Sequence, residues 1–337
     1  MKKITAIIVN WNDKNVIGEC IQSTLNQDID QIDIIVSDNG SKDGSIDYIR
    51  KSFPSVQILE NCKNLGFGSA INKGLAVAKG DYLIFLNSDL KLNPKCFGEL
   101  AKLLESDSSI GGAIPKILHI DQQKIINSLG VLINYTGIAY PNLLGQKDPG
   151  YQEPFESACG GIFMLKREVF KTVGGFDEDL FLYHEDHDLS WRIRLAGWRL
   201  KVAPQAIMYH HYNFNKGVLK YYSSEKNRLH ILLKNMEIKT LALISPALIV
   251  IEFCQWFHAV IHKWFLLKMK SYIEIFKLFP LILIKRKKLK LLRKVSDKEI
   301  TRVYQGTLSI SGTNNPLLTY LVSPILNIYW KIIHHLI

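Results

Sequence analysis

Strand-like and helical apolar patterns alternate along the first third of the chain, and this alternation limits the fold more than any other feature. The expected strands are residues 4–11, 32–38, 55–60 and 81–86, and the expected helices are residues 14–27 and 68–80. Strands that alternate with helices at this spacing form parallel sheets with right-handed crossovers. The sequence therefore predicts a doubly wound α/β domain.

Regular patterns return after a central region that is harder to assign. Residues 117–157 are punctuated by Gly and Pro, which predicts a connecting region of turns and loops. Beyond it we expect strands at 161–166 and 206–211. We also expect three helices: one that begins at Arg167, one over 184–198, and one that ends near Asn235.

Positive charge is concentrated in the last third of the chain. The chain of 337 residues has a net charge of +11, yet residues 236–337 hold 15 Lys and Arg against 5 Asp and Glu. Residues 1–235 are therefore nearly neutral, and the two parts differ as polymers. We expect an α/β domain over 1–235 and a basic helical region over 236–337. No recognised nucleic-acid-binding motif accompanies the basic residues, which argues against a nucleic-acid partner.

The cysteines are scattered along the chain and not paired. None forms a C-x-x-C motif, which argues against a zinc cluster, and their odd number argues against a disulfide scaffold. The apolar run after the first lysines is too short for the apolar region of a signal peptide and has a strand pattern. We therefore expect a chain that stays in the reducing cytosol. The cysteines are Cys20, Cys62, Cys96, Cys159 and Cys254.

Lone carboxylates and small polar residues follow two of the predicted strands. Asp38 ends the second strand, and Asn87, Ser88 and Asp89 follow the fourth. Such residues form turns and cap helices, and this explanation alone accounts for both segments. The alternative is ligand binding at the carboxyl edge of a parallel sheet. Asp38 would then accept hydrogen bonds from a nucleotide base or ribose, and Asp89 would offer a hard oxygen to Mg²⁺ or Mn²⁺.

A glycine-bearing loop, NLGFGSAINKG at residues 64–74, opens the helix predicted at 68–80. It matches neither the dinucleotide-binding motif nor the P-loop, so those phosphate-binding devices are unsupported. Close packing of the helix on the sheet explains Gly66 and Gly68 as well as a ligand contact does. Packing alone does not explain Asn72.

Five titratable residues in succession, His184 to Asp188, begin the helix predicted at 184–198. Acidic residues at a helix start interact favourably with its dipole, which is the simplest explanation. They directly follow the apolar residues FLY, however, so part of the cluster is expected to be buried. Burial raises the basicity of a carboxylate and suits a general base. His210 and His211 end a predicted strand, where alternation directs one toward the cleft, as a packed side chain or a metal ligand.

Together these segments resemble family 2 glycosyltransferases with the GT-A fold, and within that family the rhamnosyltransferase-like enzymes of bacterial polysaccharide synthesis. The resemblance covers residues 3–235, and its specificity comes from six motifs in the right order. It implies a Rossmann-like, mostly parallel central sheet flanked by helices. The motifs are IIVNWN, SDNGSKDGS, NLGFGSAINKG, FLNSDL, the segment from GGIFMLKR to RLAGW, and YHHYNF.

The resemblance implies a nucleotide-sugar donor, Mn²⁺ or Mg²⁺ as cofactor, and inversion at the anomeric carbon. The residues NSD stand where the family has D-x-D, with Asp89 as the metal-binding carboxylate. Asp186 would be the base that deprotonates the acceptor hydroxyl, and Glu185 and Asp188 would orient it or bind acceptor. Either His210 or His211 would help to hold the metal. The implied donor-binding residues are Asn10, Asp38, Gly66, Asn72, Asn87, Ser88 and Asp89.

The implied donor is a dTDP- or UDP-sugar, with L-rhamnose from dTDP-rhamnose as the sugar that the subgroup suggests. The implied acceptor is a saccharide or a lipid-linked saccharide. Processive relatives carry a Q-x-x-R-W motif that is absent from this sequence, so we expect non-processive transfer. A different class stays open, namely a catalytically inactive membrane-bound scaffold or sugar-nucleotide-binding module. Intact Asp89 and Asp186 favour an enzyme.

The basic region combines apolar segments with clustered lysines. Its first apolar run, 241–251, is shorter than the roughly 20 residues of a spanning helix. Polar residues then recur at helical spacing from Glu252 to His262, which is typical of an interfacial helix. The apolar segment 272–284 precedes a polybasic cluster, 285–294, and anionic headgroups attract such clusters at about 1 kcal/mol per basic residue. We expect peripheral attachment to the inner face of the cell membrane. The alternative is a helical subdomain with a solvated basic face.

Overall fold

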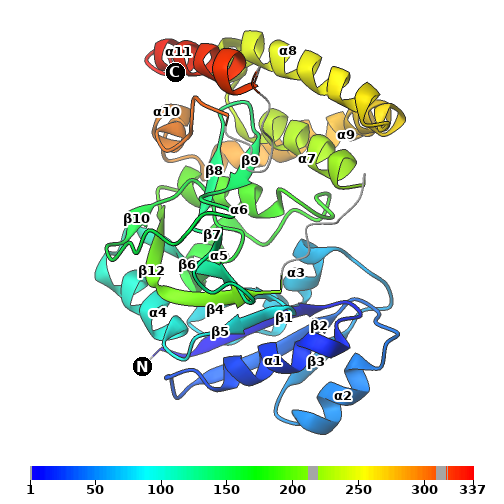
Figure 1. The fold of residues 1–337 in the computed structure, drawn as a ribbon, viewed down its shortest axis with the longest axis vertical. Coiled ribbons are helices and arrows are strands. Elements are labelled where there is room, and N and C mark those ends of the chain that lie inside the picture. Colours follow the sequence, from blue (N-terminus) through cyan, green and yellow to red (C-terminus); the bar gives the residue numbers. More distant parts are fainter. Residues whose placement is uncertain (1, 212–218, 309–315, 317) are drawn as a thin grey trace.

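The computed structural model describes residues 2–211, 219–308, 316 and 318–337 (Figure 1). Its centre is one mixed sheet in which the strands follow the order β10-β12-β6-β11-β4-β1-β2-β3, with β5 beside β12 and β7 beside β6. The strands are β1 (Ile4–Asn10), β2 (Ile32–Asp38), β3 (Gln57–Glu60), β4 (Tyr82–Asn87), β5 (Leu90–Leu92), β6 (Ile110–His119), β7 (Ile126–Ser128), β8 (Val131–Ile133), β9 (Ala139–Pro141), β10 (Phe155–Glu156), β11 (Met164–Lys166) and β12 (Arg199–His210).

The expected α/β architecture is confirmed, with one antiparallel strand inside the sheet. Strands β1 to β4 are parallel to one another, and β12 is parallel to β6. Strand β11 lies between β4 and β6 and is antiparallel to both. The helices are α1 (Lys14–Leu25), α2 (Ser45–Ser52), α3 (Phe67–Val77), α4 (Cys96–Ser106), α5 (Arg167–Val173), α6 (Glu185–Leu195), α7 (Leu219–Asn235), α8 (Ile238–Ile261), α9 (Phe265–Leu292), α10 (Asp297–Thr301) and α11 (Ser323–Ile333), with a π-helical turn at Leu318–Val322.

Apolar side chains alternate between two cores because successive residues of a strand point to opposite faces. On β1, Ile4 and Ile8 pack with α1 and α4 on one face of the sheet. Ile7 packs on the other face, among residues of α3 and α6. Both faces are covered, so the central strands are almost continuously buried, as parallel strands usually are.

The sequence missed the six strands β5 to β10 and underestimated the length of β12. Residues 117–157, expected to be a connecting region, hold the end of β6 and the short strands β7 to β10. Strand β12 begins at Arg199 and not at residue 206. The short strand β5 was also not predicted. Residues 212–214 of the YHHYNF motif lie outside the described residues.

A third core joins the α/β region to the C-terminal helices. Tyr135 and Trp191 pack there with Leu232 of α7, Ile244 of α8 and Trp330 of α11. The Tyr135 and Trp330 rings stack at 4.6 Å. The boundary expected at residue 235 therefore falls inside a shared apolar core.

The basic region forms a layer of helices at the end of the molecule opposite α1 and α2 (Figure 1). The apolar run expected at 241–251 is part of α8, which has 24 residues. Within the described residues, α8 alone is long and apolar enough to cross a membrane by length and composition. Only 22% of its most apolar stretch is buried.

Candidate active site

The carboxyl ends of β1, β2 and β4 meet at one edge of the sheet. Asn10 lies opposite Asp38, and Val9 lies opposite Asn87. Ligands of open α/β sheets bind outside the carboxyl ends of parallel strands. The fold therefore brings the predicted donor-binding residues of three strands to one edge.

Asn10 and Asp38 build the turn at this edge. The Asp38 carboxylate accepts hydrogen bonds from the backbone N–H groups of Gly40 and Ser41, at 3.0 and 2.9 Å, and from the Asn10 amide at 2.7 Å. The Asn10 amide also lies within 2.9 Å of the Ser45 hydroxyl. Both side chains are buried. The turn therefore explains both residues, and their contact with a nucleoside stays a prediction.

Gly66 and Asn72 hold the acidic segment against the sheet. Gly66 has a φ of +83°, and a Cβ there would overlap the carbonyl oxygen of Phe181. The Asn72 amide donates to the carbonyl oxygen of Phe176 at 3.0 Å and accepts from its N–H at 2.8 Å. These contacts explain Asn72 as a brace between α3 and a segment about a hundred residues away, and its contact with a donor stays a prediction.

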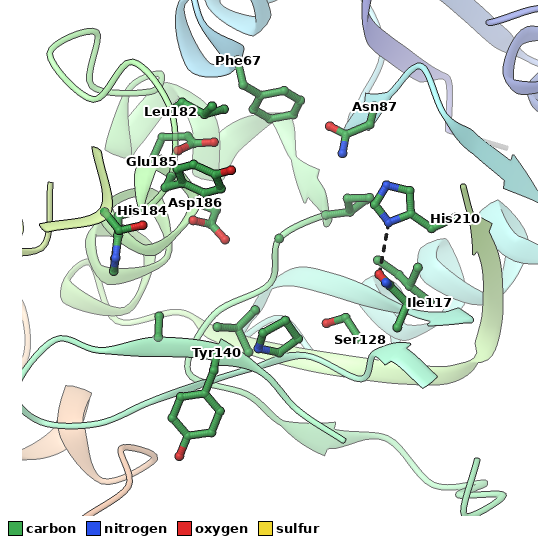
Figure 2. Close-up of a pocket in the computed structure, with 18 of the residues that line it drawn as sticks. Phe67, Asn87, Ile117, Ser128, Tyr140, Leu182, His184, Glu185, Asp186 and His210 are labelled. Carbon is green, nitrogen blue, oxygen red and sulfur yellow. Dashed lines mark hydrogen bonds between the residues drawn. The ribbon is translucent and has the colours of Figure 1, made fainter. Parts of the chain in front are cut away.

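Asp89 and His210 meet at the end of β4 and β12. The Asp89 Oδ1 and the His210 Nε2 are 3.1 Å apart, and the His210 Nδ1 is 3.1 Å from Asn127 Oδ1 (Figure 2). His211 points elsewhere, since its Nε2 lies 3.1 Å from Glu19. Between the two histidines that the sequence left open, only His210 lines the pocket.

This pair fits a divalent cation. If the Nδ1–H of His210 donates to the Asn127 oxygen, the lone pair of Nε2 faces the Asp89 carboxylate. Two acceptors then face each other, and a proton or a cation between them would turn this repulsion into attraction. A carboxylate oxygen and an imidazole nitrogen suit Mn²⁺. Ser88 donates to Asp13, whose pKa is raised by burial and by the nearby Asp89 and Asp43 carboxylates.

Glu185 and Asp186 begin α6 and face the pocket. Asp186 accepts from the backbone N–H of His187 at 2.8 Å and lies 3.5 Å from the Cys159 thiol. Burial raises the pKa of Asp186, and burial together with the Asp186 charge raises the pKa of Glu185 to about 8. Among the described residues, Glu185 Oε2 has no hydrogen-bond partner. Glu185 is therefore poised to hold a proton, and the neighbouring Asp186 carboxylate is poised to accept one.

The backbone before this pair is strained and is held by α7. Tyr183 and His184 have φ values of +69° and +68°, which are uncommon for residues other than glycine. The side-chain amide of Asn227 donates to the carbonyl oxygens of Leu182 and Tyr183, at 3.0 and 2.7 Å. The structure thus uses a residue of α7 to set the entry into α6.

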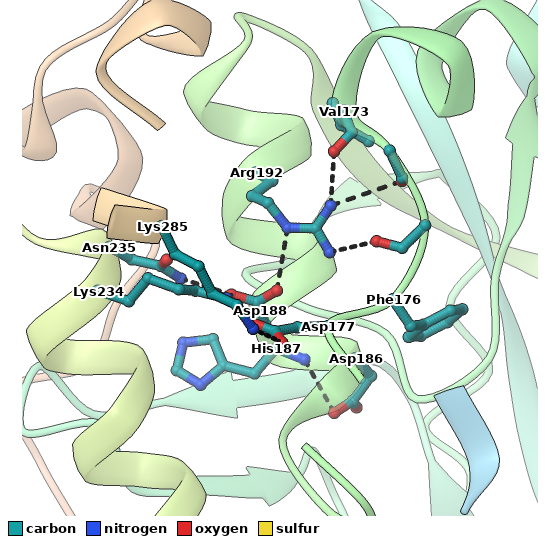
Figure 3. Close-up of polar contacts among 12 residues, drawn as sticks. Val173, Phe176, Asp177, Asp186, His187, Asp188, Arg192, Lys234, Asn235 and Lys285 are labelled. Atoms are coloured by element: carbon teal, nitrogen blue, oxygen red, sulfur yellow. Dashed lines mark hydrogen bonds and ion pairs between the residues drawn. The ribbon is translucent and has the colours of Figure 1, made fainter. Parts of the chain in front are cut away.

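Asp188 lies behind the site and not in it. Its carboxylate is fully buried and binds Arg192 at 2.9 Å, Lys234 at 2.6 Å and the Asn235 amide at 3.0 Å (Figure 3). Burial alone would raise its pKa, but the two cations outweigh this and hold the pKa at about 2. Of the two roles expected for Asp188, acceptor contact is corrected, because no face of the carboxylate is exposed. The orienting role is compatible with its position.

A cavity of about 330 Å³ lies between the carboxylates at the start of α6 and the ends of β4 and β12. Glu185 and Asp186 lie on one side of it, and Asn87 and His210 lie on the other (Figure 2). Its floor includes Ser128 and Tyr140, and α7 contributes residues to its rim. The cavity is therefore large enough for a sugar between two sets of polar groups.

A second acidic cluster lies outside the cavity. Asp177, Asp179 and His230 offer ligand atoms within 4.8 Å of one another. Lys285 binds both carboxylates and Lys234 binds Asp177 (Figure 3). The lysines already neutralise this cluster, so it serves as an ion-pair network.

Four residues of the site were not predicted from the sequence. Asn127 supports His210, Asp13 lies beside Ser88, Cys159 contacts Asp186, and Asn227 holds the backbone before Glu185. Asp13 directly follows the motif IIVNWN, and Cys159 directly precedes the segment that begins with GGIFMLKR. All four residues act through contacts between distant parts of the chain, which leave no local pattern.

Comparison with known proteins places the site in a family. The model of glycosyl transferase family 2 matches residues 5–174, half of the chain, and the model of the N-terminal domain of galactosyltransferase matches residues 143–214. The chain is 28% identical over 207 residues to N-acetylglucosaminyl-diphospho-decaprenol L-rhamnosyltransferase of Mycobacterium tuberculosis. It is 23% identical over 214 residues to poly-beta-1,6-N-acetyl-D-glucosamine synthase of Staphylococcus aureus.

These matches cover part of each protein. The rhamnosyltransferase match spans 53% of this chain and 66% of that relative, and the synthase match spans 61% and 49%. Among solved structures, GalNAc-T7 with UDP, GalNAc and Mn²⁺ superposes with a TM-score of 0.60 at 18% identity, over 72% of this chain and 50% of that one. S. aureus TarS gives a TM-score of 0.51 at 16% identity, over 73% and 43%.

The structural likenesses establish the GT-A fold, and the family match over half of the chain establishes more than the fold. With the six motifs in order and the strand ends joined at one edge, the chain belongs to glycosyl transferase family 2 and is a glycosyltransferase.

Proposed function

We propose that the chain is an inverting, metal-dependent glycosyltransferase that transfers a sugar from a nucleotide-sugar donor to a hydroxyl of a saccharide. The observation that carries this proposal is the arrangement across the cavity. The carboxylates of Glu185 and Asp186 face Asn87 and His210 (Figure 2), and Asp89 lies 3.1 Å behind His210. Direct displacement with inversion needs a base on one face of the anomeric carbon and the leaving diphosphate on the other.

Asp186 is the proposed base. As the acceptor oxygen attacks the anomeric carbon, Asp186 takes its proton, the new glycosidic bond forms, and the bond from that carbon to the diphosphate oxygen breaks. The electron pair of the broken bond leaves with the nucleoside diphosphate. A raised pKa makes Asp186 a stronger base, and general-base catalysis of this kind contributes roughly 10²–10⁴-fold.

Asp89 and His210 are proposed to hold Mn²⁺ or Mg²⁺. Such a cation would neutralise the negative charge that develops on the leaving diphosphate. Asn87 is uncharged, so Asp89 supplies the carboxylate of the NSD segment, with Asp13 as a neighbouring acidic group. The hydrogen bond from His210 to Asn127 would keep the imidazole oriented toward the ligand.

The name of one relative suggests the substrates. A rhamnosyltransferase that acts on a lipid-linked sugar supports a dTDP-rhamnose donor and a lipid-linked saccharide acceptor in bacterial cell-surface polysaccharide synthesis. A UDP-sugar is the other donor to test. Absence of Q-x-x-R-W supports transfer of one or a few sugars.

A lipid-linked acceptor needs an enzyme at the membrane. We propose a division of labour in which residues 1–235 catalyse and residues 236–337 attach the enzyme to the cytoplasmic face of the cell membrane. The concentration of positive charge after residue 236 and the length and hydropathy of α8 support this division.

Thermal unfolding with a panel of nucleotide sugars tests the donor and the metal together. A ligand that binds only the folded state raises the melting temperature. We expect one dTDP- or UDP-sugar to raise it in the presence of Mn²⁺, and His210→Ala to lose most of this shift while the neighbouring His211→Ala keeps it. Equal shifts in both variants would contradict the proposed ligand. No shift with any nucleotide sugar would contradict a donor-binding enzyme and favour a scaffold.

A further inference from the structure

The outward faces of the C-terminal helices are apolar over most of their length. On α8 the exposed side chains recur at helical spacing and include Phe253, 76% exposed, and Phe257. On α9 they include Leu266 and Phe276, the latter 83% exposed. Soluble proteins rarely expose a contiguous apolar patch of more than a few hundred Å². On α11 the exposed apolar side chains include Ile325, Ile328 and Ile332.

Charged groups lie on the inward faces of the same helices. Lys268 of α9 is fully buried, and its Nζ lies 2.7 Å from Glu225 of α7, 2.9 Å from Glu252 of α8 and 3.0 Å from Gln255. Arg228 of α7 bonds to both glutamates. The polar stripe that the sequence suggested for a headgroup-facing surface therefore points, at Glu252 and Gln255, into the protein.

We propose that the outward faces of α8, α9 and α11 lie in the plane of one leaflet of an anionic bilayer, and that α8 does not cross it. This inference rests on the membrane attachment proposed above and adds the surface and its orientation. For α8 to span, Glu252 would have to leave Lys268 and Arg228. Breaking buried ion pairs is strongly unfavourable, because the charges left behind stay buried without partners.

The charges beside the apolar patch argue for a lipid surface. Lys270 and Lys277 of α9 are exposed and lie seven residues apart, so they share one side of the helix next to Leu266 and Ile273. Lysines along an apolar stripe can bury their stems and place their ammonium groups at the level of anionic headgroups. A protein interface is instead depleted of charge at its core.

The inference also places the cavity near the membrane. Ser224 of α7 lines the cavity, and the next residue, Glu225, binds Lys268 of α9. In Figure 1, α7 lies between the elements of the active site and the outer helices. A lipid-linked acceptor held in the leaflet would reach the cavity past α7.

Two natural cysteines provide the first test. Cys254 lies on the exposed face of α8, and Cys62 is exposed near β3 at the other end of the molecule; the other three cysteines are buried. With vesicles of phosphatidylcholine and phosphatidylglycerol, we expect maleimide labelling of Cys254 to slow roughly tenfold and that of Cys62 to stay unchanged. Equal labelling with and without vesicles would overturn the proposal. Protection of Cys254 without vesicles would also overturn it, in favour of a second protein copy.

Probes at both ends of α8 distinguish lying from spanning. Ile238→Cys and Ile261→Cys, each with Cys62 and Cys254 replaced by Ser, would carry a fluorophore that a membrane-impermeant reagent quenches. We expect opening the vesicle to increase the quenching of neither end, because both ends lie at the outer leaflet. Protection of one end until the vesicle is opened would show a span and overturn the proposal.

Surface variants separate this inference from the proposed reaction. Phe253→Gln with Phe257→Gln changes two exposed side chains, and we expect most vesicle binding to be lost while the donor-induced thermal shift is retained. Tyr48→Gln on α2 is the matched control and should bind vesicles normally. Normal binding by the double variant would refute the docking surface. If no nucleotide sugar raises the melting temperature of the wild type, the proposed function is refuted instead.

Discussion

Asn227→Ala tests whether α7 sets the position of the catalytic carboxylates. The Asn227 amide donates to the carbonyl oxygens of Leu182 and Tyr183, at 3.0 and 2.7 Å, and Glu185 and Asp186 follow two residues later. The side chain is fully buried. Alanine removes both donors and leaves two carbonyl groups without these bonds.

The structure gives the size of the expected effect. Each hydrogen bond contributes about 1 kcal/mol, so the free energy of unfolding should fall by about 2 kcal/mol. The two bonds also hold Tyr183 and His184 in left-handed conformations, which cost on the order of 1–3 kcal/mol each. Without them the backbone can relax and displace Asp186, and a displacement of about 1 Å can lower kcat on the order of 10²-fold.

The assay compares kcat, donor KM and thermal unfolding with a matched variant. Asn134 is also a buried asparagine, and its amide donates to the carbonyl oxygens of residues 305–307 at 3.0–3.1 Å. We expect Asn134→Ala to lose comparable stability and to keep its kcat per folded molecule. Asn227→Ala should lose kcat with little change in donor KM, because the donor edge lies on other strands. Wild-type kcat in Asn227→Ala would refute the positioning role.

Three further predictions follow from the structure and the sequence. Burial and the Asp186 charge raise the pKa of Glu185 to about 8, so the contribution of Glu185 to the free energy of unfolding should be highest below pH 4.5 and fall as pH rises toward 8. In Glu185→Gln this part of the pH dependence should vanish in thermal unfolding at pH 5 and pH 8, and an unchanged difference would contradict the buried carboxyl. Lys268→Met should lower the free energy of unfolding by about 3–5 kcal/mol in denaturant titration, because Glu225 and Glu252 lose a buried partner, whereas the exposed Lys270→Met should have little effect. Product-length analysis should show one or a few added sugars, and a ladder of long products would contradict non-processive transfer.

Strands with nearly uninterrupted apolar runs were predictable from the sequence. The apolar residues of β1, β2 and β4 mark these strands to within a residue or two of their ends. Strand β6 was missed because Gly111, Gly112 and Pro115 interrupt its pattern. The structure explains two of these residues: a Cβ at Gly111 would lie 2.7 Å from Trp198, and one at Gly112 would lie 2.5 Å from Leu200. Such requirements come from neighbours more than 80 residues away.

The candidate site divides in the same way. Asp89, Asp186 and His210 stood in motifs at strand or helix ends, and the fold brings His210 and Asp186 to one cavity with Asp89 beside it. Asn72 and Asp188 stood in the same motifs, yet their partners are a distant backbone segment and a lysine of α7. A motif identifies the residue type that a position needs, whereas the side chain's partner depends on the tertiary fold.

Sugar transfer by wild type and Asp186→Asn tests the central claim most directly. Asparagine has nearly the same shape as aspartate and cannot accept the proton of the acceptor hydroxyl. With Mn²⁺ and the donor identified by thermal shift, we expect the transfer rate to fall by roughly 10²–10⁴-fold while the donor-induced thermal shift is retained. Equal transfer rates in the two proteins would contradict Asp186 as the base and with it the proposed mechanism.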